Sequence, residues 1–210
     1  MSDDDDPDVH QAYALKTPED SKRLYASWAA TYDQSFAQST GFAMPAHVAE
    51  LFHAHGGKGP VLDAGAGTGL VAGAILQSGF CEIDGFDISA EMLAESRDKG
   101  FYRALIEGDL TKALPFAEAA LDIVMNGVSL MHILSYETAI AEARRVAARW
   151  CIFHTVPATK ELQTTVLCKK AYGEKTIEVI INEGELHQLL EKNGLMVHHI
   201  LQSIPYDLDR

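Results

Sequence analysis

The chain has 210 residues, of which 47% are hydrophobic and 22% charged, and these are the proportions of a folded globular protein rather than a disordered one. At about 150 residues per domain, this length accommodates one domain with an appendage and excludes a second catalytic domain. The 17 Lys and Arg residues against 30 Asp and Glu residues give a net charge of −13, so the surface repels nucleic-acid phosphates and anionic lipid headgroups. We therefore expect neither a nucleic-acid partner nor a membrane partner.

The N-terminal residues and the cysteines predict a cytoplasmic protein. The chain begins MSDDDDPD, which is acidic where a secretory signal needs basic residues, and no run approaches the ~18 apolar residues of a membrane span. Cys81, Cys151 and Cys168 form no C-x-x-C pair, so they predict neither a zinc site nor a disulfide framework. We expect residues 1–18 to be a disordered acidic leader and residues 19–210 to be a single domain.

A helical pattern with an aromatic face precedes the centre of the chain. Within residues 19–35, Leu24, Trp28 and Tyr32 recur at steps of four and lie on one face of the predicted helix. Such a row commonly belongs to a core. Because this helix precedes the main sheet, it could instead fold over that sheet as a lid of residues 19–44.

The centre of the chain alternates short apolar strands with helices, which indicates an α/β fold: a doubly wound, mostly parallel Rossmann-like sheet with helices on both faces. After Pro157 the pattern changes to a predicted β-hairpin, inserted as a wall over residues 158–182, with its turn at Tyr172. The expected strands are Pro60–Gly65, Glu82–Ile88, Arg103–Asp109, Leu121–Asn126, Trp150–Val156, Thr164–Lys169, Thr176–Ile181 and Leu195–Ser203, and the expected helices are Gly69–Ser78, Ala90–Lys99, Tyr136–Ala148 and Gly184–Lys192.

A glycine-rich loop, DAGAGTG at 63–69, joins the first strand of this sheet to its helix. Its backbone N–H groups and the positive end of the helix are expected to be free for a ligand, although glycines alone can serve only a tight turn. Asp87 ends the next strand, where its oxygens can accept both hydroxyls of a ribose. The sequence therefore predicts an adenosine-containing cofactor at this edge of the sheet.

Two features favour S-adenosylmethionine over a dinucleotide. The glycine spacing is G-x-G-x-G, whereas the dinucleotide fingerprint is G-x-G-x-x-G. A carboxylate at Asp63 would oppose a pyrophosphate ~4 Å away by up to ~4 kcal/mol at an effective dielectric of ~20, and it would attract the ammonium of the methyl donor. Asp109 ends the third strand and could accept a hydrogen bond from an adenine amino group, or serve only as a turn residue.

Taken together, these motifs resemble the class I S-adenosylmethionine-dependent methyltransferase family. The resemblance covers about residues 21–203. It further includes YASWAATYD at 25–33, which is similar to the N-terminal helix of small-molecule members such as quinone-biosynthesis C-methyltransferases. The motifs that stand in the family's order are DAGAGTG at 63–69, GFDIS at 85–89, EGDL at 107–110 and LDIVMNG at 121–127.

The resemblance implies a methyltransferase domain that takes S-adenosylmethionine as cofactor and a small molecule as methyl acceptor. Tyr25, Trp28 and Tyr32 would close over the donor. The family's final antiparallel hairpin has no obvious counterpart here, so the last edge strand would be missing or supplied by residues 164–181. The implied donor contacts are Gly65, Ala66 and Gly67 to the methionine moiety, Asp87 to the ribose, Ile88 and Met92 to the adenine face, Asp109 and Leu110 to its edge, and Asn126 and Gly127 beside the acceptor pocket.

His132 and His154 follow strands at the ligand edge and are the candidate catalytic residues. Each could remove a proton from the acceptor, or simply bond a backbone group or water. Methyl transfer is an in-line displacement, so a base is needed only when the acceptor still carries its proton. No histidine–carboxylate cluster has metal-ligand spacing, so no metal is predicted. The histidines expected at the surface are His53, His55, His198 and His199.

Other functions stay open on this reading. The same fold could bind the cofactor without turnover, as a regulatory module. The strand–loop–helix unit and Asp87 would also serve a nicotinamide-dependent oxidoreductase. Against nucleic-acid methylation, the sequence contains neither an Asn/Asp-Pro-Pro-Tyr motif nor the Pro-Cys nucleophile of cytosine C5 enzymes.

Overall fold

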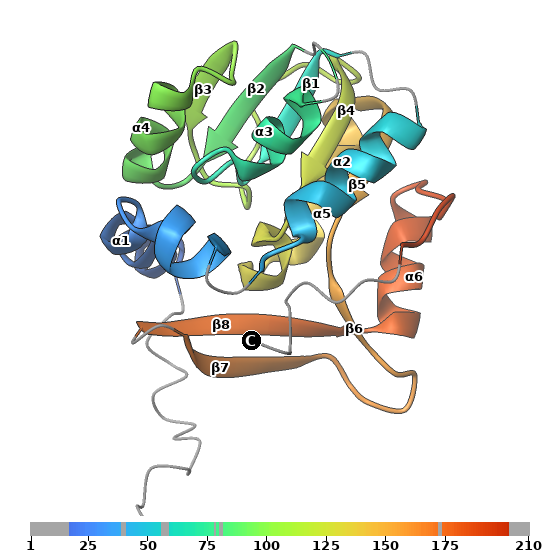
Figure 1. Ribbon diagram of the computed structural model, residues 1–210. Helices are drawn as coiled ribbons and strands as arrows, with labels where there is room; N and C mark the ends of the chain where they lie inside the picture. Colours follow the sequence, from blue (N-terminus) through green and yellow to red (C-terminus); the bar gives the residue numbers. More distant parts are fainter. Residues whose placement is uncertain are drawn as a thin grey trace, which may run out of the picture.

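The computed structural model describes residues 17–38, 41–55, 59–77, 79, 82–171 and 174–201, which fold around two sheets (Figure 1). The main sheet has the strand order β3-β2-β1-β4-β5 with every neighbouring pair parallel, so the predicted doubly wound sheet is confirmed. Its strands are β1 (Val61–Ala64), β2 (Ile83–Asp87), β3 (Ala104–Glu107), β4 (Leu121–Asn126) and β5 (Ala147–Phe153). The helical elements are α1 (Pro18–Trp28), η2 (Asp33–Gln38), α2 (Met44–Ala54), α3 (Leu70–Leu76), α4 (Ala90–Lys99), η3 (Ser129–His132), α5 (Tyr136–Val146) and α6 (Glu183–Lys192).

Helices cover both faces of the main sheet and bury its strands. On one face, Phe52 of α2 and Ile75 of α3 belong to one buried hydrophobic cluster with alternate strand residues. On the other face, Val146 at the end of α5 packs with Leu62 and Val124. Burial from both sides explains the mostly apolar residues of β1 and β4, whereas the edge strand β3 is partly exposed.

The carboxyl ends of the main strands point towards α1 and the second sheet (Figure 1). Helix α1 begins earlier than predicted, because Thr17 caps it and exchanges hydrogen bonds with Asp20. The last residues of the predicted leader, Thr17 and Pro18, are therefore part of this helix, while residues 1–16 lie outside the described residues. The helix also ends earlier, at Trp28, and a π-helical turn, η2, follows it.

Helix α2 was not predicted. Pro45 occupies its first turn, and Met44, Val48 and Phe52 are buried at helical spacing. These signals were present in the sequence, between the region taken as a lid and the first strand. The helix matters for the site because it brings His47 towards the end of β5.

The predicted hairpin is confirmed, and it belongs to a separate mixed sheet. β7 (Thr165–Ala171) and β8 (Glu174–Asn182) are antiparallel, and β6 (Val156–Ala158) joins β8 in parallel. The hairpin therefore does not supply an edge strand to the main sheet, which ends at β5 in the described part of the chain. Tyr172 lies outside the described residues.

The predicted last strand, Leu195–Ser203, is wrong over its described residues. Residues 195–201 are irregular, and ring contacts hold them in place of strand pairing. The His198 ring lies 5.1 Å from Trp150 of β5 and 5.2 Å from His55, between ring centroids. His53, His198 and His199 are exposed as predicted, whereas His55 is half-buried in this ring cluster. Among the described helices, none has the length and hydropathy to cross a bilayer.

Candidate functional site

The loop between β1 and α3 places three glycines in the left-handed backbone region, at φ 86° for Gly65, 52° for Gly67 and 88° for Gly69. A side chain at Gly65 is excluded for two reasons. The backbone there has a positive φ, and a Cβ would lie 2.0 Å from the Ser129 Oγ. Around Gly67 nothing comes within 4 Å of an added Cβ. The loop thus leaves open space above Gly67, against which a ligand can lie.

The backbone amides of Gly65, Ala66, Gly67 and Gly69 are not free, which corrects the prediction that the amides of this loop await a ligand. Gly65 N and Ala66 N donate to the Phe86 carbonyl at 2.7 and 3.1 Å. Gly67 N donates to Asp87 Oδ2 at 2.8 Å, and Gly69 N donates to the Ala66 carbonyl at 2.9 Å. A diphosphate cradle needs unpaired N–H groups, so this loop is poorly suited to a dinucleotide.

Asp63 is completely buried at the end of β1. Its Oδ2 accepts a 2.8 Å hydrogen bond from the Tyr102 hydroxyl, while its Oδ1 is buried without a hydrogen-bond partner among the described residues. The pKa of Asp63 is raised to about 7: burial is the main cause, the Tyr102 hydrogen bond opposes it, and the charge of nearby Asp87 adds to it. A buried carboxyl with an orphaned oxygen favours a positively charged ligand group and disfavours phosphate.

Asp87 is the last residue of β2, and its carboxylate accepts a hydrogen bond from the glycine loop. Its Oδ1 accepts from Ser89 N at 2.9 Å while Oδ2 accepts from Gly67 N, so both oxygens keep lone pairs for further donors. Burial raises the pKa of Asp87, and the backbone hydrogen bonds oppose this shift. Ile88, which directly follows Asp87, is half-buried, and Met92 of α4 is buried and donates its backbone N–H to the Ser89 hydroxyl.

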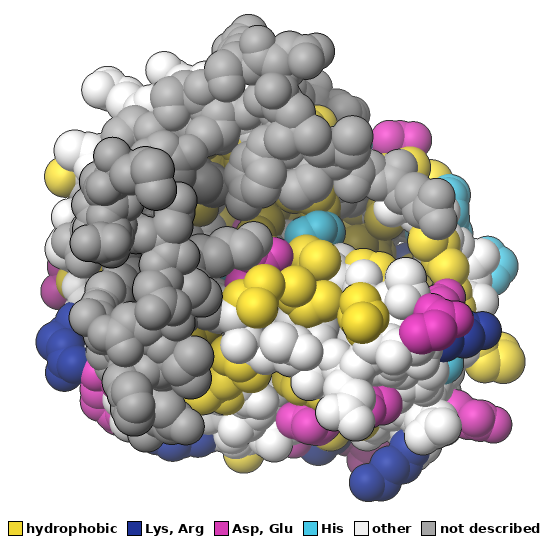
Figure 2. Space-filling model, turned by 90° about the horizontal axis from the view of Figure 1, so that it is seen from below, with side chains coloured by type: hydrophobic (Ala, Val, Ile, Leu, Met, Phe, Trp, Pro, Cys, Tyr) yellow, Lys and Arg dark blue, Asp and Glu magenta, His cyan; other side chains and the backbone are white. Residues whose placement is uncertain are grey.

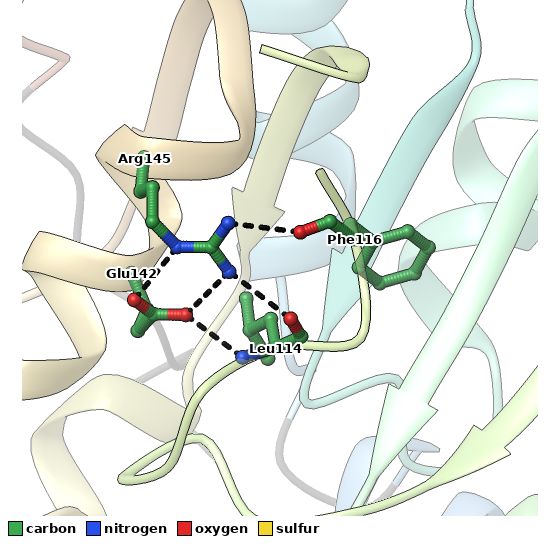
Figure 3. Close-up of polar contacts among 4 residues, drawn as sticks. All are labelled: Leu114, Phe116, Glu142 and Arg145. Carbon is green, nitrogen blue, oxygen red and sulfur yellow. Dashed lines mark hydrogen bonds and ion pairs between the residues drawn. The ribbon is translucent and has the colours of Figure 1, made fainter. Parts of the chain in front are cut away.

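The loop after β3 carries Asp109 and Leu110 and is fastened to α5. Asp109 Oδ1 accepts from the amide and hydroxyl of Thr111, which is the turn role considered from the sequence, and its Oδ2 lies 3.5 Å from the Lys112 ammonium. The fastening consists of Arg145 and Glu142 (Figure 3). The Arg145 guanidinium donates to the carbonyls of Leu114 and Phe116, and the Glu142 carboxylate accepts from Leu114 N.

Asn126 ties the end of β4 to the glycine loop. Its side-chain amide donates to the Ala64 carbonyl at 2.7 Å and to Ser129 Oγ at 2.6 Å, and its Oδ1 accepts from Leu130 N. Gly127 lies close to α3, since an added Cβ would be 2.8 Å from Val71 Cγ2. Ser129 fills the space beside Gly65, and the sequence reading missed it because a lone serine after a strand carries no distinctive signal.

Aromatic side chains of α1 and of Tyr32 form a chain of ring contacts that reaches His132 of η3. The Tyr25 ring centroid lies 6.2 Å from Trp28 and 6.5 Å from His132, and the Trp28 centroid lies 6.3 Å from Tyr32. His132 Nδ1 is 2.5 Å from the carbonyl of Ile177 in β8. Because a carbonyl can only accept, Nδ1 carries the ring hydrogen and Nε2 is the basic nitrogen.

His154 follows β5 and lies near His132 and His47. Its backbone N–H donates to the Asn126 carbonyl at 3.0 Å, and its Nδ1 is buried without a hydrogen-bond partner among the described residues. Burial lowers the pKa of His154, nearby His132 and His47 lower it further, and Glu178 opposes them. Seen from the side of the second sheet, a histidine lies in a hollow bordered by hydrophobic side chains (Figure 2).

The structure therefore gathers the predicted site residues along one edge of the main sheet, around the ends of β1, β2, β3, β4 and β5. The sequence reading missed Tyr102, which holds Asp63, and the ion pair that joins Lys99 to Asp33. It also missed the fastening of the β3 loop by Arg145. No local motif marks these residues, because each acts on a partner far away in the sequence. In the described part of the chain, no group of three or more His, Cys, Asp or Glu side chains could hold a metal ion.

A family described as "Methyltransferase domain" matches residues 62–153, which run from β1 to the end of β5. Over these residues, which are less than half of the chain, it is similar to methyltransferase domains. The comparisons support the predicted resemblance to class I S-adenosylmethionine-dependent methyltransferases, and they support S-adenosylmethionine as the cofactor of this domain.

Sequence relatives of the methyltransferase domain include two curated proteins. One is a malonyl-[acyl-carrier protein] O-methyltransferase of Enterobacter lignolyticus, 34% identical over 86 residues, which are 41% of this chain and 34% of the relative. The protein of the same name from Pectobacterium atrosepticum is 35% identical over 96 residues, or 46% of this chain and 37% of that relative. The match thus spans about a third of the length of these relatives.

Solved structures share the fold of the methyltransferase domain over most of the chain. A complex of DhpI with S-adenosylhomocysteine has a TM-score of 0.64 at 21% identity and covers 86% of this chain and 88% of that one. The 1,6-didemethyltoxoflavin-N1-methyltransferase of Burkholderia thailandensis, solved with that compound and S-adenosylhomocysteine, has a TM-score of 0.59 at 19% identity. It covers 84% of this chain and 79% of its own. At these identities the likeness concerns the fold.

Proposed function

We propose that the chain is an enzyme that transfers a methyl group from S-adenosylmethionine to an oxygen, nitrogen or carbon atom of a small molecule. The observation that carries this proposal is the glycine loop, whose amides donate within the protein above the buried carboxyls of Asp63 and Asp87. That arrangement suits the zwitterionic amino-acid end of the methyl donor and opposes a diphosphate. It also argues against a nicotinamide-dependent oxidoreductase.

The residues present fit the donor. The open space above Gly67 and the orphaned Oδ1 of Asp63 would receive its methionine part, with Gly65 and Ala66 beside them. Asp87 would hold the ribose hydroxyls. The remaining proposed contacts are Ile88 and Met92 to the adenine face, Asp109 and Leu110 to its edge, Asn126 and Gly127 beside the transferred methyl, and Tyr25, Trp28 and Tyr32 over the donor.

The bound donor supplies an electrophilic methyl group on a sulfonium. The protein has to hold the acceptor in line with that group and exclude water, and orientation of this kind contributes up to ~7–11 kcal/mol. Residues 18–38 and the hairpin β7–β8 form the proposed enclosure, within one domain. We assign proton removal from the acceptor to His132, whose Nδ1–Ile177 contact leaves Nε2 as the basic nitrogen, and we place His154 next to it.

The acceptor is proposed to be a small molecule rather than a nucleic acid, because a net charge of −13 repels phosphate backbones. The curated relatives are named for O-methylation of a malonyl group on a carrier protein, while one structural neighbour is named for N-methylation of a small heterocycle. Both names fit a site in which positioning supplies most of the catalysis.

Donor carrying a labelled methyl group tests the proposal directly. The purified chain is incubated with this donor and a protein-free metabolite extract, and the small-molecule fraction is then separated and counted. We expect label in a discrete small-molecule product, and we expect Asp87→Ala to weaken donor binding by about 1–3 kcal/mol. Donor binding without any labelled product would favour a regulatory module, and no donor binding would overturn the proposal.

A further inference from the structure

Three residues join the lid segment to the glycine loop. Asp33 is the first residue of η2, Thr68 lies between Gly67 and Gly69, and Lys99 is the last residue of α4. The Thr68 hydroxyl donates to Asp33 Oδ1, and the Lys99 ammonium donates to Asp33 Oδ2 and, at 2.6 Å, to the Thr68 carbonyl. Each of these residues thus bonds both others.

This triangle is better protected than an ordinary surface ion pair. Thr68 is 2% exposed, and the side chains of Lys99 and Asp33 are 27% and 32% exposed. Charge-assisted hydrogen bonds in such partly buried positions are stronger than neutral ones, because water competes less for the charged groups. The shared ammonium also fixes the geometry of the loop, since it holds the carbonyl and the side-chain partner of the same threonine.

A second ion pair on the lid provides a contrast. Lys22 of α1 pairs with Glu107 at the end of β3, and these side chains are 42% and 49% exposed. Exposed single pairs of this kind contribute little. The two attachments also differ in where they end: Lys22 reaches a strand end, whereas Asp33 reaches the loop that forms the proposed donor site.

We infer that Asp33, Thr68 and Lys99 form a clasp that holds the lid segment, residues 18–38, closed against the glycine loop and so sets how long the methyl donor stays bound. The inference rests on the proposed donor site. The three are positioning residues: they act through the loop and through the aromatic side chains of the lid. Because the clasp is bonded to the loop itself, donor binding and lid closure stabilise each other reciprocally.

Release of radiolabelled S-adenosylhomocysteine, chased with excess unlabelled compound, measures the residence time. Lys99→Met removes two of the three hydrogen bonds of the clasp and Thr68→Val removes one, and both changes keep similar side-chain volume. We expect both variants to release the compound about tenfold faster than the wild type. Lys99→Arg, which can still pair with Asp33, should restore slow release, and Lys22→Met is the matched control expected to stay within about twofold. In the double variant Asp33→Asn/Lys99→Met, the effects should not add, because both changes break one unit.

Hydrogen exchange of the ligand-free chain is the second readout. Lys99→Met should accelerate hydrogen exchange within residues 18–38 and leave exchange in the strands of the main sheet unchanged. Lys22→Met should leave the exchange rates of both regions unchanged. If the wild type binds no S-adenosylhomocysteine, the proposed function fails, and exchange alone then decides whether the clasp holds the lid. Equal release rates in Lys99→Met and Lys22→Met, or unchanged exchange in Lys99→Met, would overturn the clasp.

Discussion

At the scale of single residues, the site depends on carboxyl groups that the fold removes from water. Asp63 could be assigned from the sequence because it directly precedes the glycine loop. Its complete burial and its hydrogen bond to Tyr102 could not, since Tyr102 follows a different helix 39 positions later. A large separation in sequence also conceals Ser129, which packs against Gly65. Spacing therefore identified the residue types at the site, and tertiary packing decided their ionisation and their partners.

The raised pKa of Asp63, about 7, gives a prediction with a definite sign. The unfolded chain has the ordinary Asp pKa of ~3.9, so between about pH 4 and 7 the native state binds more protons than the unfolded state. The free energy of unfolding should therefore fall as the pH rises through this window. Asp63→Asn should remove the Asp63 share of this fall, about 2–4 kcal/mol, in urea unfolding at several pH values, whereas Asp87, whose pKa is also raised by burial, keeps its own share.

Donor affinity should change in the opposite direction over the same window. A donor ammonium stabilises the ionised carboxyl, so S-adenosylhomocysteine should bind the wild type more tightly as the pH rises from about 5.5 to 7.5, and Asp63→Asn should bind it weakly at every pH. Asp84→Asn is the control, since Asp84 is also buried in the sheet but pairs with Arg103. A wild-type affinity independent of pH would contradict the role given to Asp63.

His132 gives a second prediction at this scale. If its Nε2 takes a proton from the acceptor, His132→Gln should lower kcat by about 10²-fold or more and remove the ionisation of this group from the pH profile. The exposed His187 of α6 supplies the control variant, His187→Gln, which should leave kcat unchanged. With the acceptor found by labelling, an unaltered kcat in His132→Gln would show that His132 removes no proton and serves only to bond the Ile177 carbonyl.

At the scale of elements, the alternation of strands and helices could be predicted because the central strands β1, β2 and β4 are buried and short helices separate the strands. The existence of β1 to β5 followed from apolar runs, and the hairpin β7–β8 followed from its turn signal. Boundaries moved where capping decided them, as at Thr17 of α1. The prediction of the last strand was wrong. Ring contacts of His198 with His55 and Trp150 are found there in place of backbone pairing, and periodicity cannot reveal such contacts.

The fastening of the β3 loop to α5 belongs to this scale. Arg145→Met removes the donors to the carbonyls of Leu114 and Phe116, so we expect lower stability in urea unfolding and faster hydrogen exchange in residues 108–119. Arg144→Met, one residue earlier on α5, loses only a 3.5 Å contact with the Ala147 carbonyl and should change little. Equal effects of the two substitutions would show that the loop does not depend on this guanidinium.

At the scale of the whole molecule, the strand ends of one sheet, the lid and a second sheet together frame the proposed site. Composition indicated a folded globular chain and charge indicated the kind of partner, because both depend on averages over the chain. The separation of the hairpin into its own sheet could not be predicted, since it depends on the parallel pairing of β6 with β8 across more than 20 residues.

The net charge of −13 leads to a prediction for the molecule as a whole. Fluorescence anisotropy with labelled single-stranded DNA and RNA oligonucleotides should show no saturable binding at physiological salt, because phosphate contacts dominate such affinities. A complex that weakens steeply with added salt would instead reveal a local basic surface and would reopen nucleic acid as the acceptor.

The central claim is that the loop between β1 and α3 receives the amino-acid end of a methyl donor rather than a diphosphate. Parallel calorimetric titrations of the same protein with S-adenosylhomocysteine and with NADH measure this choice directly. We predict saturable binding of S-adenosylhomocysteine at one site and no measurable heat of binding with NADH. Tight, saturable binding of NADH with none of S-adenosylhomocysteine would contradict the account.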